Sequence, residues 1–115
     1  MSNWTPKLLL EDIIESAKKI LQYTKGISFE EFSEDNKTVD AVIRNFEIIG
    51  EASSLIPDEI KDKYSEIDWH RIRGFRNRIV HDYFGVDLQI IWKIIHEQIS
   101  GLITGISKIL LNFWQ

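Results

Sequence analysis

Four residues in the stretch RNRIVHDYFGVD (residues 76–87) have side chains that could do chemistry: Arg76, Asn77, His81 and Tyr83. Histidine can take up or release a proton near neutral pH, and arginine can grip a phosphate and stabilise the charge that develops on it. Arg76 and His81 together therefore suit RNA cleavage without a metal, in which a ribose 2′-hydroxyl attacks the neighbouring phosphate. From spacing alone, an equally good alternative is structural, with Arg76 in a salt bridge and His81 capping a helix.

A metal centre is not expected near these residues. The three histidines, His70, His81 and His96, lack the spacing of metal ligands, and few carboxylates lie near His81 in the sequence. The chain contains no cysteine, which excludes thiolate metal sites, disulfides and cysteine nucleophiles. We expect neither a metal nor a bound cofactor.

Basic residues are concentrated around the same stretch. Four arginines and no acidic residue lie between His70 and Arg78, which leaves −8 for the rest of a chain whose net charge is −4. Nonspecific coating of nucleic acid is therefore disfavoured, whereas a confined basic patch suits a small anionic segment of substrate or an acidic partner. The simplest role for Arg71, Arg73 and Arg78 is a solvated helix face, and the alternative is a role in holding RNA or a protein partner.

The hydrophobic pattern that must position these residues is helical, with no sustained alternation typical of strands. For a chain of 115 residues we expect one all-α domain, residues 1–115, built as an up-and-down bundle of four to five helices. The expected elements are a helix at 7–24, a helical turn at 28–32, a helix at 37–56, a short helix from 58 and helices at 68–81 and 88–112. The expected caps and breaks are a capping box of Ser28 with Glu31, N-caps at Asp68 and Asp87, a first-turn Pro57, and breaks at Gly26 and Gly85.

Glycines inside two of these helices suggest close packing. Gly74 lies within helix 68–81, where it costs about 1 kcal/mol relative to alanine or marks a close approach. Gly101 and Gly105 are four residues apart in the last helix, which is typical of a close helix contact. We expect no phosphate-binding loop there.

The helix expected at 37–56 is apolar on two sides. One face carries Val39, Val42, Ile43, Phe46, Ile49 and Ser53. The nearly opposite face carries Ile48, Ala52 and Leu55. A helix of this kind is buried on two sides, which favours a dimer.

Helix geometry separates the candidate catalytic residues. With Ile72 and Phe75 facing inward, Arg76 and Tyr83 fall on the core-facing flank, while Asn77 and His81 fall on the other side. The angle between Arg76 and His81 is about 140° at 100° per residue. The length of arginine, unwinding of the last turn, or a second copy of the chain could bring them together.

An arginine at the edge of a core needs a polar or anionic partner. Glu47 and Glu51 are four residues apart on helix 37–56, beside Arg44. Our hypothesis is that one of these glutamates orients Arg76. The candidate supporting residues are Arg44, Glu47, Glu51 and Arg73.

Three stretches of the sequence resemble one known family. They are AVIRNFEIIGEAS at 41–53, IDWHRIRGFRNRIVHDYF at 67–84 and VDLQIIW at 86–92. The second contains an Arg-x4-His-x-Tyr motif similar to that of the HepT-like toxins, small helical ribonucleases of the HEPN superfamily. The resemblance covers most of the chain, from about Leu8 to Ile99, and the core motif shows no departure from the family pattern.

The resemblance implies a HEPN-like helical bundle that dimerises through the motif region. It implies an RNase toxin of a type II toxin–antitoxin pair, with Arg76 and His81 as the catalytic pair and Asn77 as their polar companion. It also implies a partner, a minimal nucleotidyltransferase antitoxin that transfers AMP from ATP to Tyr83. A bulky anion attached at Tyr83 would occupy the phosphate site beside Arg76.

A second hypothesis of a different class is a non-catalytic helical binding module that docks a nucleotidyltransferase. In either case, we expect a cytoplasmic protein without a membrane span. The N-terminal sequence MSNWTPKLLLEDII has only a short apolar run, interrupted by Glu11 and Asp12, which is unlike a signal peptide. No apolar stretch reaches about 18 residues.

Overall fold

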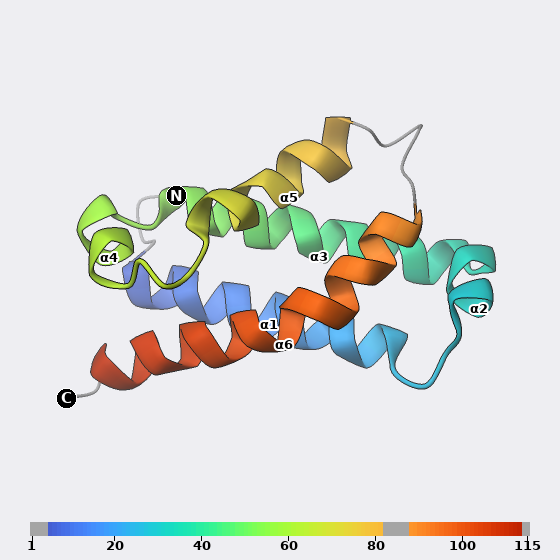
Figure 1. The fold of residues 1–115 in the computed structure, drawn as a ribbon, viewed down its shortest axis with the longest axis horizontal. Coiled ribbons are helices and arrows are strands. Elements are labelled where there is room, and N and C mark those ends of the chain that lie inside the picture. The colour runs from blue at the N-terminus through green and yellow to red at the C-terminus, as the bar shows by residue number, and fades with distance from the viewer. Residues whose placement is uncertain (1–4, 82–87, 114–115) are drawn as a thin grey trace.

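A computed structural model describes residues 5–81 and 88–113, with side chains for 5–75 and 88–112. These residues form six helices and no strand (Figure 1). The helices are α1 (Pro6–Thr24), α2 (Phe29–Glu34), α3 (Asn36–Leu55), α4 (Asp58–Lys63), α5 (Trp69–His81) and α6 (Leu88–Phe113). The all-α prediction is confirmed. Four long helices form a bundle, and the short helices α2 and α4 are added to it.

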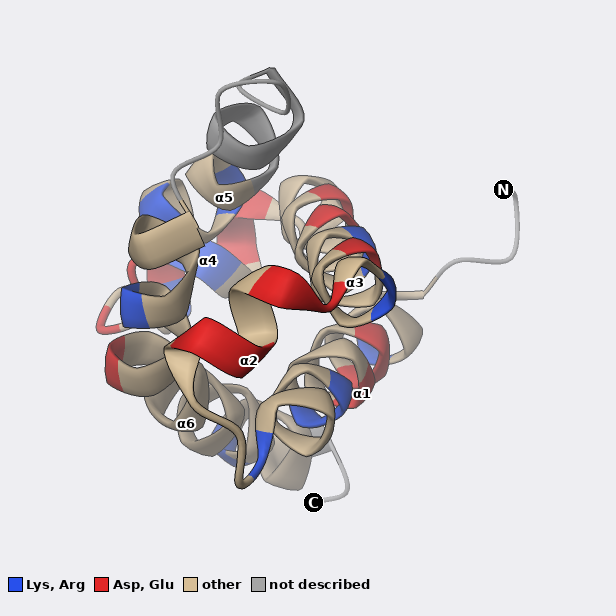
Figure 2. Cartoon of the chain, turned by 90° about the vertical axis from the view of Figure 1, so that its right-hand side faces the viewer, with Lys and Arg blue, Asp and Glu red and all other residues tan. Residues whose placement is uncertain are grey.

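The four long helices run in alternating directions along the bundle (Figure 1). Helix α1 packs against α3 and α6, and α3 packs in addition against α5. Seen along the bundle, α2 and its acidic residues lie at the near end, where α2 contacts α3 and α6 (Figure 2). Within the described residues, no helix is both long enough and apolar enough to cross a membrane.

Helix α3 is buried on two sides, as its pattern predicted, but its own chain supplies both neighbours, α1 and α5. On the predicted first face all residues are buried, including Phe46 and Ile49 with no exposed surface. On the second face Ala52 is buried and Ile48 is half-buried, but Leu55 is 44% exposed, so its expected burial is wrong. Two-sided burial therefore does not require a second chain, and the dimer stays a prediction.

Side-chain caps fix where the helices begin. The Ser28–Glu31 capping box is formed, and Asp68 Oδ1 accepts a hydrogen bond from the Arg71 backbone N–H at 3.0 Å, as predicted. Gly26 lies in the turn that follows α1 and has a φ of +75°, a backbone conformation that favours glycine. Pro57 lies at the N-cap of α4, one residue before the first turn expected for it. The expected cap at Asp87 and break at Gly85 lie outside the described residues.

The two glycines of α6 differ. A Cβ atom at Gly105 would lie 3.3 Å from the Ile67 side chain, so this glycine does allow a close contact, with the turn before α5. Gly101 is exposed, and a Cβ there would meet nothing within 4 Å. The predicted close contact at Gly101 is therefore wrong.

Asp35 connects α2 to α3 and is the basis of a pH-dependent prediction. Its Oδ2 accepts a hydrogen bond from Thr38 Oγ1 at 2.6 Å, and its Oδ1 accepts one from the Thr38 backbone N–H at 3.2 Å. The Thr38 side-chain bond, followed by the backbone bond, lowers the pKa of the Asp35 carboxyl below its ordinary value of 3.8. The cap therefore stabilises the fold above that value and is lost as pH falls through the lowered pKa.

We expect Asp35→Ala to lower the urea midpoint at neutral pH, because α3 loses its N-cap. The gap between wild type and variant should close as pH falls well below 3.8. Asp62→Ala, at an exposed aspartate of α4 without a described hydrogen bond, is the matched control. A gap for Asp35→Ala that stayed constant down to acid pH would contradict this account.

Candidate active site

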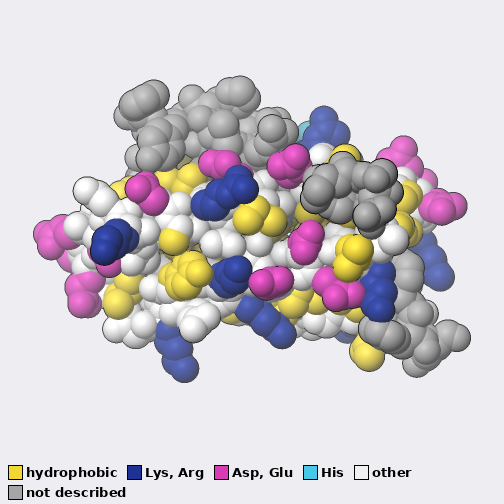
Figure 3. Space-filling model, turned by 180° about the vertical axis from the view of Figure 1, so that it is seen from behind, with side chains coloured by type: hydrophobic (Ala, Val, Ile, Leu, Met, Phe, Trp, Pro, Cys, Tyr) yellow, Lys and Arg dark blue, Asp and Glu magenta, His cyan; other side chains and the backbone are white. Residues whose placement is uncertain are grey.

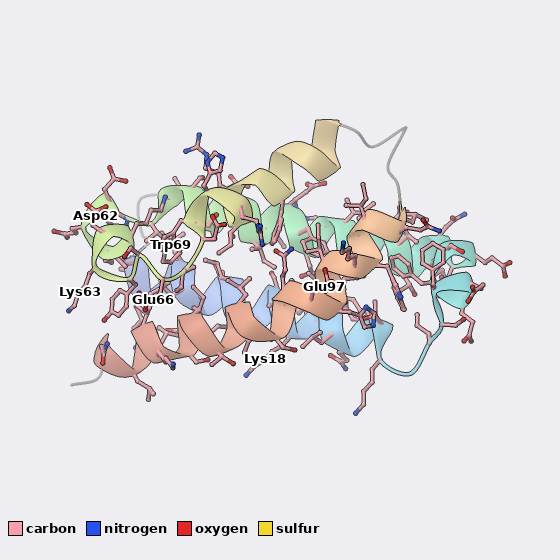
Figure 4. The ribbon with its side chains drawn as sticks, viewed as in Figure 1. Lys18, Asp62, Lys63, Glu66, Trp69 and Glu97 are labelled. Carbon is pink, nitrogen blue, oxygen red and sulfur yellow. The ribbon has the colours of Figure 1, made fainter. Side chains whose placement is uncertain are left out.

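The beginning of α5 is fixed by the turn before it. Trp69 is 9% exposed, and its ring Nε1 donates a hydrogen bond to the Tyr64 carbonyl oxygen at 3.1 Å. The Tyr64 hydroxyl accepts one from Asn112 Nδ2 at 2.6 Å, near the end of α6. Trp69 and Glu66 lie together at the α4 end of the bundle (Figure 4). These bonds hold the start of α5 against the last turns of α6.

The rotation of α5 about its own axis is fixed by its apolar side. Ile72 and Phe75 are buried, as predicted, and the Phe75 ring meets the Phe46 ring of α3 edge to face, with centroids 5.4 Å apart. Because α5 has 3.6 residues per turn, this packing places position 76 beside the inward flank and positions 77 and 81 on the outer side. Buried Ile72 and Phe75 therefore determine which motif positions lie beside the core and which lie on the outer side of α5.

Three predicted site residues, Arg76, Asn77 and His81, lie on α5, which ends at His81 as expected. The structure describes the backbone of these three residues but not their side chains, and Tyr83 lies outside the described residues. The meeting of Arg76 with His81 therefore stays a prediction.

The predicted supporting residues lie on the two helices that pack together. On α3, Arg44 Nη1 lies 3.5 Å from Glu47 Oε2, in an i,i+3 pair whose arginine side chain is 67% exposed. Exposed ion pairs of this kind stabilise a fold by about 0–1 kcal/mol, so the pair with Arg44 leaves Glu47 able to contact another residue. Glu51 on α3 and Arg73 on α5 are exposed. The hypothesis that a glutamate of α3 orients Arg76 stays a prediction.

Sequence reasoning missed a groove between α5 and α6. It consists of two cavities of about 490 and 430 Å³, which share Asp68, Arg71, Phe75 and Gln98. The larger cavity extends along α6 past Gly101 to Lys108, and the smaller one reaches Gly74. A Cβ at Gly74 would meet nothing within 4 Å, so the close packing considered for this glycine is not present among its described neighbours. Gly74 was the sequence signal for the groove, but it was interpreted as a packing feature.

Charge is distributed as the sequence indicated. His70, Arg71 and Arg73 are exposed on α5, while acidic residues are frequent on α2 and on α1. On α1, partial burial and then the neighbouring Glu15 and Glu11 raise the pKa of the Asp12 carboxyl. From behind, apolar side chains form small groups separated by charged ones (Figure 3).

Metal ligands do not gather within the part of the chain that the structure describes. There, no three histidine or acidic side chains are grouped closely enough to hold an ion. His96 Nδ1 lies 2.8 Å from the Trp92 carbonyl oxygen, and its ring packs on the Trp92 ring with centroids 4.5 Å apart.

Comparison with known protein families shows to which family the chain belongs. The sequence pattern of the family "Ribonuclease HepT-like" matches residues 13–109, which include all of α2 to α5 and most of α1 and α6. The chain belongs to the ribonuclease HepT-like family. The match includes Arg76, Asn77, His81 and Tyr83 and both walls of the groove, so the predicted family resemblance is confirmed.

Relatives of similar length align over most of the chain. The "Probable ribonuclease HepT" of Thermococcus cleftensis is 46% identical over 93 residues, covering 81% of this chain and 84% of its own. "Putative RNase TTE0752" of Caldanaerobacter subterraneus subsp. tengcongensis is 40% identical over 106 residues, covering 92% and 95%. "Putative RNase MJ1380" of Methanocaldococcus jannaschii is 40% identical over 102 residues, covering 89% and 94%. No solved structure was found to match the chain.

We expect Trp69→Phe to lower the free energy of unfolding by about 0.5–1.5 kcal/mol, because it removes the ring hydrogen bond to the Tyr64 carbonyl oxygen, which keeps only its bond from the Ile67 backbone N–H. Trp92→Phe is the control, since Trp92 is half-buried against Phe29 and Phe32 and has no described ring N–H bond. Urea denaturation of both variants measures the difference. An equal loss for the two would show that the Trp69 hydrogen bond contributes nothing.

Proposed function

We propose that this HepT-like chain is a metal-independent endoribonuclease. The observation that carries the proposal is the family match across the Arg-x4-His-x-Tyr motif. In the structure, α5 is helical from Trp69 to His81, and its rotation is fixed by Ile72 and Phe75. The related proteins named as RNases support the same activity.

In the proposed reaction, a base removes the proton from a ribose 2′-hydroxyl, whose oxygen then attacks the adjacent phosphorus. The bond from phosphorus to the 5′-oxygen breaks, and that oxygen takes a proton from an acid. His81 acts as the base or the acid, because imidazole titrates near neutral pH. Arg76 binds the phosphate and stabilises its developing charge, and Asn77 orients it.

The active unit in this proposal is a homodimer. On one helix, positions 76 and 81 are about 140° apart. A second copy related by a two-fold axis would place its own motif opposite, so that the cleft is completed by two chains.

We further propose that the chain is the toxin of a type II toxin–antitoxin pair acting on cytoplasmic RNA. Its partner would be a minimal nucleotidyltransferase antitoxin that attaches AMP to Tyr83. The added phosphate would compete with RNA for Arg76. The proposal rests on the family resemblance and on the position of Tyr83 two residues after His81.

Purified protein should cleave RNA in EDTA. His81→Ala should slow cleavage by about 10²- to 10⁴-fold, the usual contribution of a positioned acid or base, and Arg76→Ala by about 10²- to 10³-fold, the usual contribution of a donor that stabilises developing charge. Lys18→Ala, which removes an exposed cation on α1, should leave cleavage unchanged (Figure 4). Circular dichroism checks that each variant is folded. If Arg76→Ala and His81→Ala cleaved as fast as wild type, the assignment of the catalytic pair would be wrong.

The alternative function, a helical binding module that docks a nucleotidyltransferase without cleaving RNA, is favoured by the confined basic patch of α5. The same experiment separates the two functions. A folded wild-type protein without cleavage would favour the binding module.

With the nucleotidyltransferase partner and ATP, the wild-type chain should gain the mass of one AMP group and lose RNase activity. Tyr83→Phe should gain no mass, whereas Tyr23→Phe, at a tyrosine of α1 that is 39% exposed, should be modified like wild type. Mass spectrometry of the intact chains gives the result. Modification of Tyr83→Phe would place the acceptor elsewhere.

A further inference from the structure

Gly74 has no structural reason within the described chain to be glycine. It lies inside α5, where glycine lowers stability relative to alanine. Space for a side chain is present, since a Cβ at Gly74 would meet nothing within 4 Å. At Gly105, by contrast, a Cβ would lie 3.3 Å from Ile67. The backbone at Gly74 is thus left uncovered by the described residues.

The smaller cavity of the α5–α6 groove lies at this glycine, and we name it the Gly74 pocket. Helix α5 and its N-cap supply Asp68, His70, Arg71, Gly74 and Phe75, and α6 supplies Ile94 and Gln98. Its volume of about 430 Å³ is within the range of sites for small ligands.

The pocket combines an apolar floor with a polar rim. Phe75 is 4% exposed and Ile94 is 6% exposed, so both present the edge of the core. At the rim, the His70 imidazole and the Gln98 amide make no hydrogen bond to a described residue, which leaves their donors and acceptors available.

Arg71 completes the rim. Its Nε lies 3.6 Å from Asp68 Oδ2, in a pair whose side chains are 61% and 59% exposed. A pair of this length and exposure is weak, so the flat guanidinium can leave it to stack on a ligand.

These walls fit a nucleobase better than a phosphate. An unpaired RNA base has apolar faces, which pack on aromatic or guanidinium planes, and polar edges, which form hydrogen bonds. The Asp68 carboxylate in the same pocket disfavours a phosphate, whereas the base itself is neutral.

The pocket also lies on the strip of α5 that leads to the motif. Positions 70, 77 and 81 fall within about 60° of position 74 at 100° per residue. Positions 74 and 81 are seven residues apart, or about 10.5 Å along the helix. An RNA strand whose phosphate is cleaved near His81 would therefore reach the pocket with a base outside the cleaved dinucleotide.

We propose that the Gly74 pocket binds an unstacked base of single-stranded RNA, one that lies outside the two nucleotides joined by the cleaved bond. Phe75, Ile94 and Arg71 contact the faces of the base, and His70 and Gln98 bind its edge. Gly74 keeps the entrance open. The proposal rests on the RNase function and deepens it, by naming single-stranded RNA longer than a dinucleotide as the substrate.

The test compares Gly74→Leu, which fills the entrance, with Ser54→Leu, which places the same side chain at an exposed position of α3 outside both cavities of the groove. Each variant is assayed on a single-stranded oligoribonucleotide and on a dinucleotide. We expect Gly74→Leu to lower kcat/KM on the oligonucleotide about 10-fold or more, since a stacked base contributes about this much or more. On the dinucleotide it should match wild type, and Ser54→Leu should match wild type on both.

Gln98→Ala, which removes a rim group without filling the pocket, should cause a loss on the oligonucleotide alone. Equal losses on both substrates, no loss on either, or dissociation of a dimer by Gly74→Leu would overturn the proposal; the last outcome would make the groove a protein interface.

If wild type cleaves neither substrate, the RNase proposal fails, and the pocket is tested by fluorescence anisotropy with labelled single-stranded RNA. Weaker binding by Gly74→Leu than by Ser54→Leu would still support the pocket. Equal binding, or no binding by wild type, would overturn it.

Discussion

The packing of Phe75 on Phe46 is the contact on which the presentation of the motif depends. The edge-to-face pair, together with buried Ile72, sets the rotation of α5 against α3. In a helix, fixing the rotation at one turn fixes the direction of every later position. The Arg-x4-His-x-Tyr motif follows Phe75 directly in sequence, so an apolar contact determines the direction in which the motif positions on α5 face.

Helix α5 packs against α3 along its apolar side and borders the open α5–α6 groove along another side. Its start is held to α6 by the bonds of Trp69, Tyr64 and Asn112, and its flank is held by α3. Between α5 and the middle of α6 lie the two cavities. A helix held in this way has a defined position and still leaves part of its surface accessible, which suits a helix that binds a polymer.

Much of the fold could be predicted because local rules govern it. The capping residues Ser28 and Asp68 were recognisable from residue type and spacing, since each cap involves a backbone group three residues away. Gly74 was only a weak signal for the α5–α6 groove, because the groove depends on how far apart two helices lie. Leu55 and Gly101 were misjudged for the same reason: residue type indicates what could be buried, and only the tertiary arrangement decides what is. Arg76 and His81 could be placed on one helix from the sequence. Positions 76 and 81 are about 140° apart around that helix, so whether the two side chains meet depends on how two chains assemble.

The hydrogen bond between Tyr64 and Asn112 joins residues 48 positions apart, and Asn112 lies in the last turn of α6. Helix α1 likewise packs against α6. Because synthesis proceeds from the N-terminus, contacts of this kind cannot form until α6 has emerged from the ribosome. A growing chain that already contains the complete motif therefore still lacks the anchor at the start of α5. Anchoring of the motif helix is in this way coupled to the synthesis of α6.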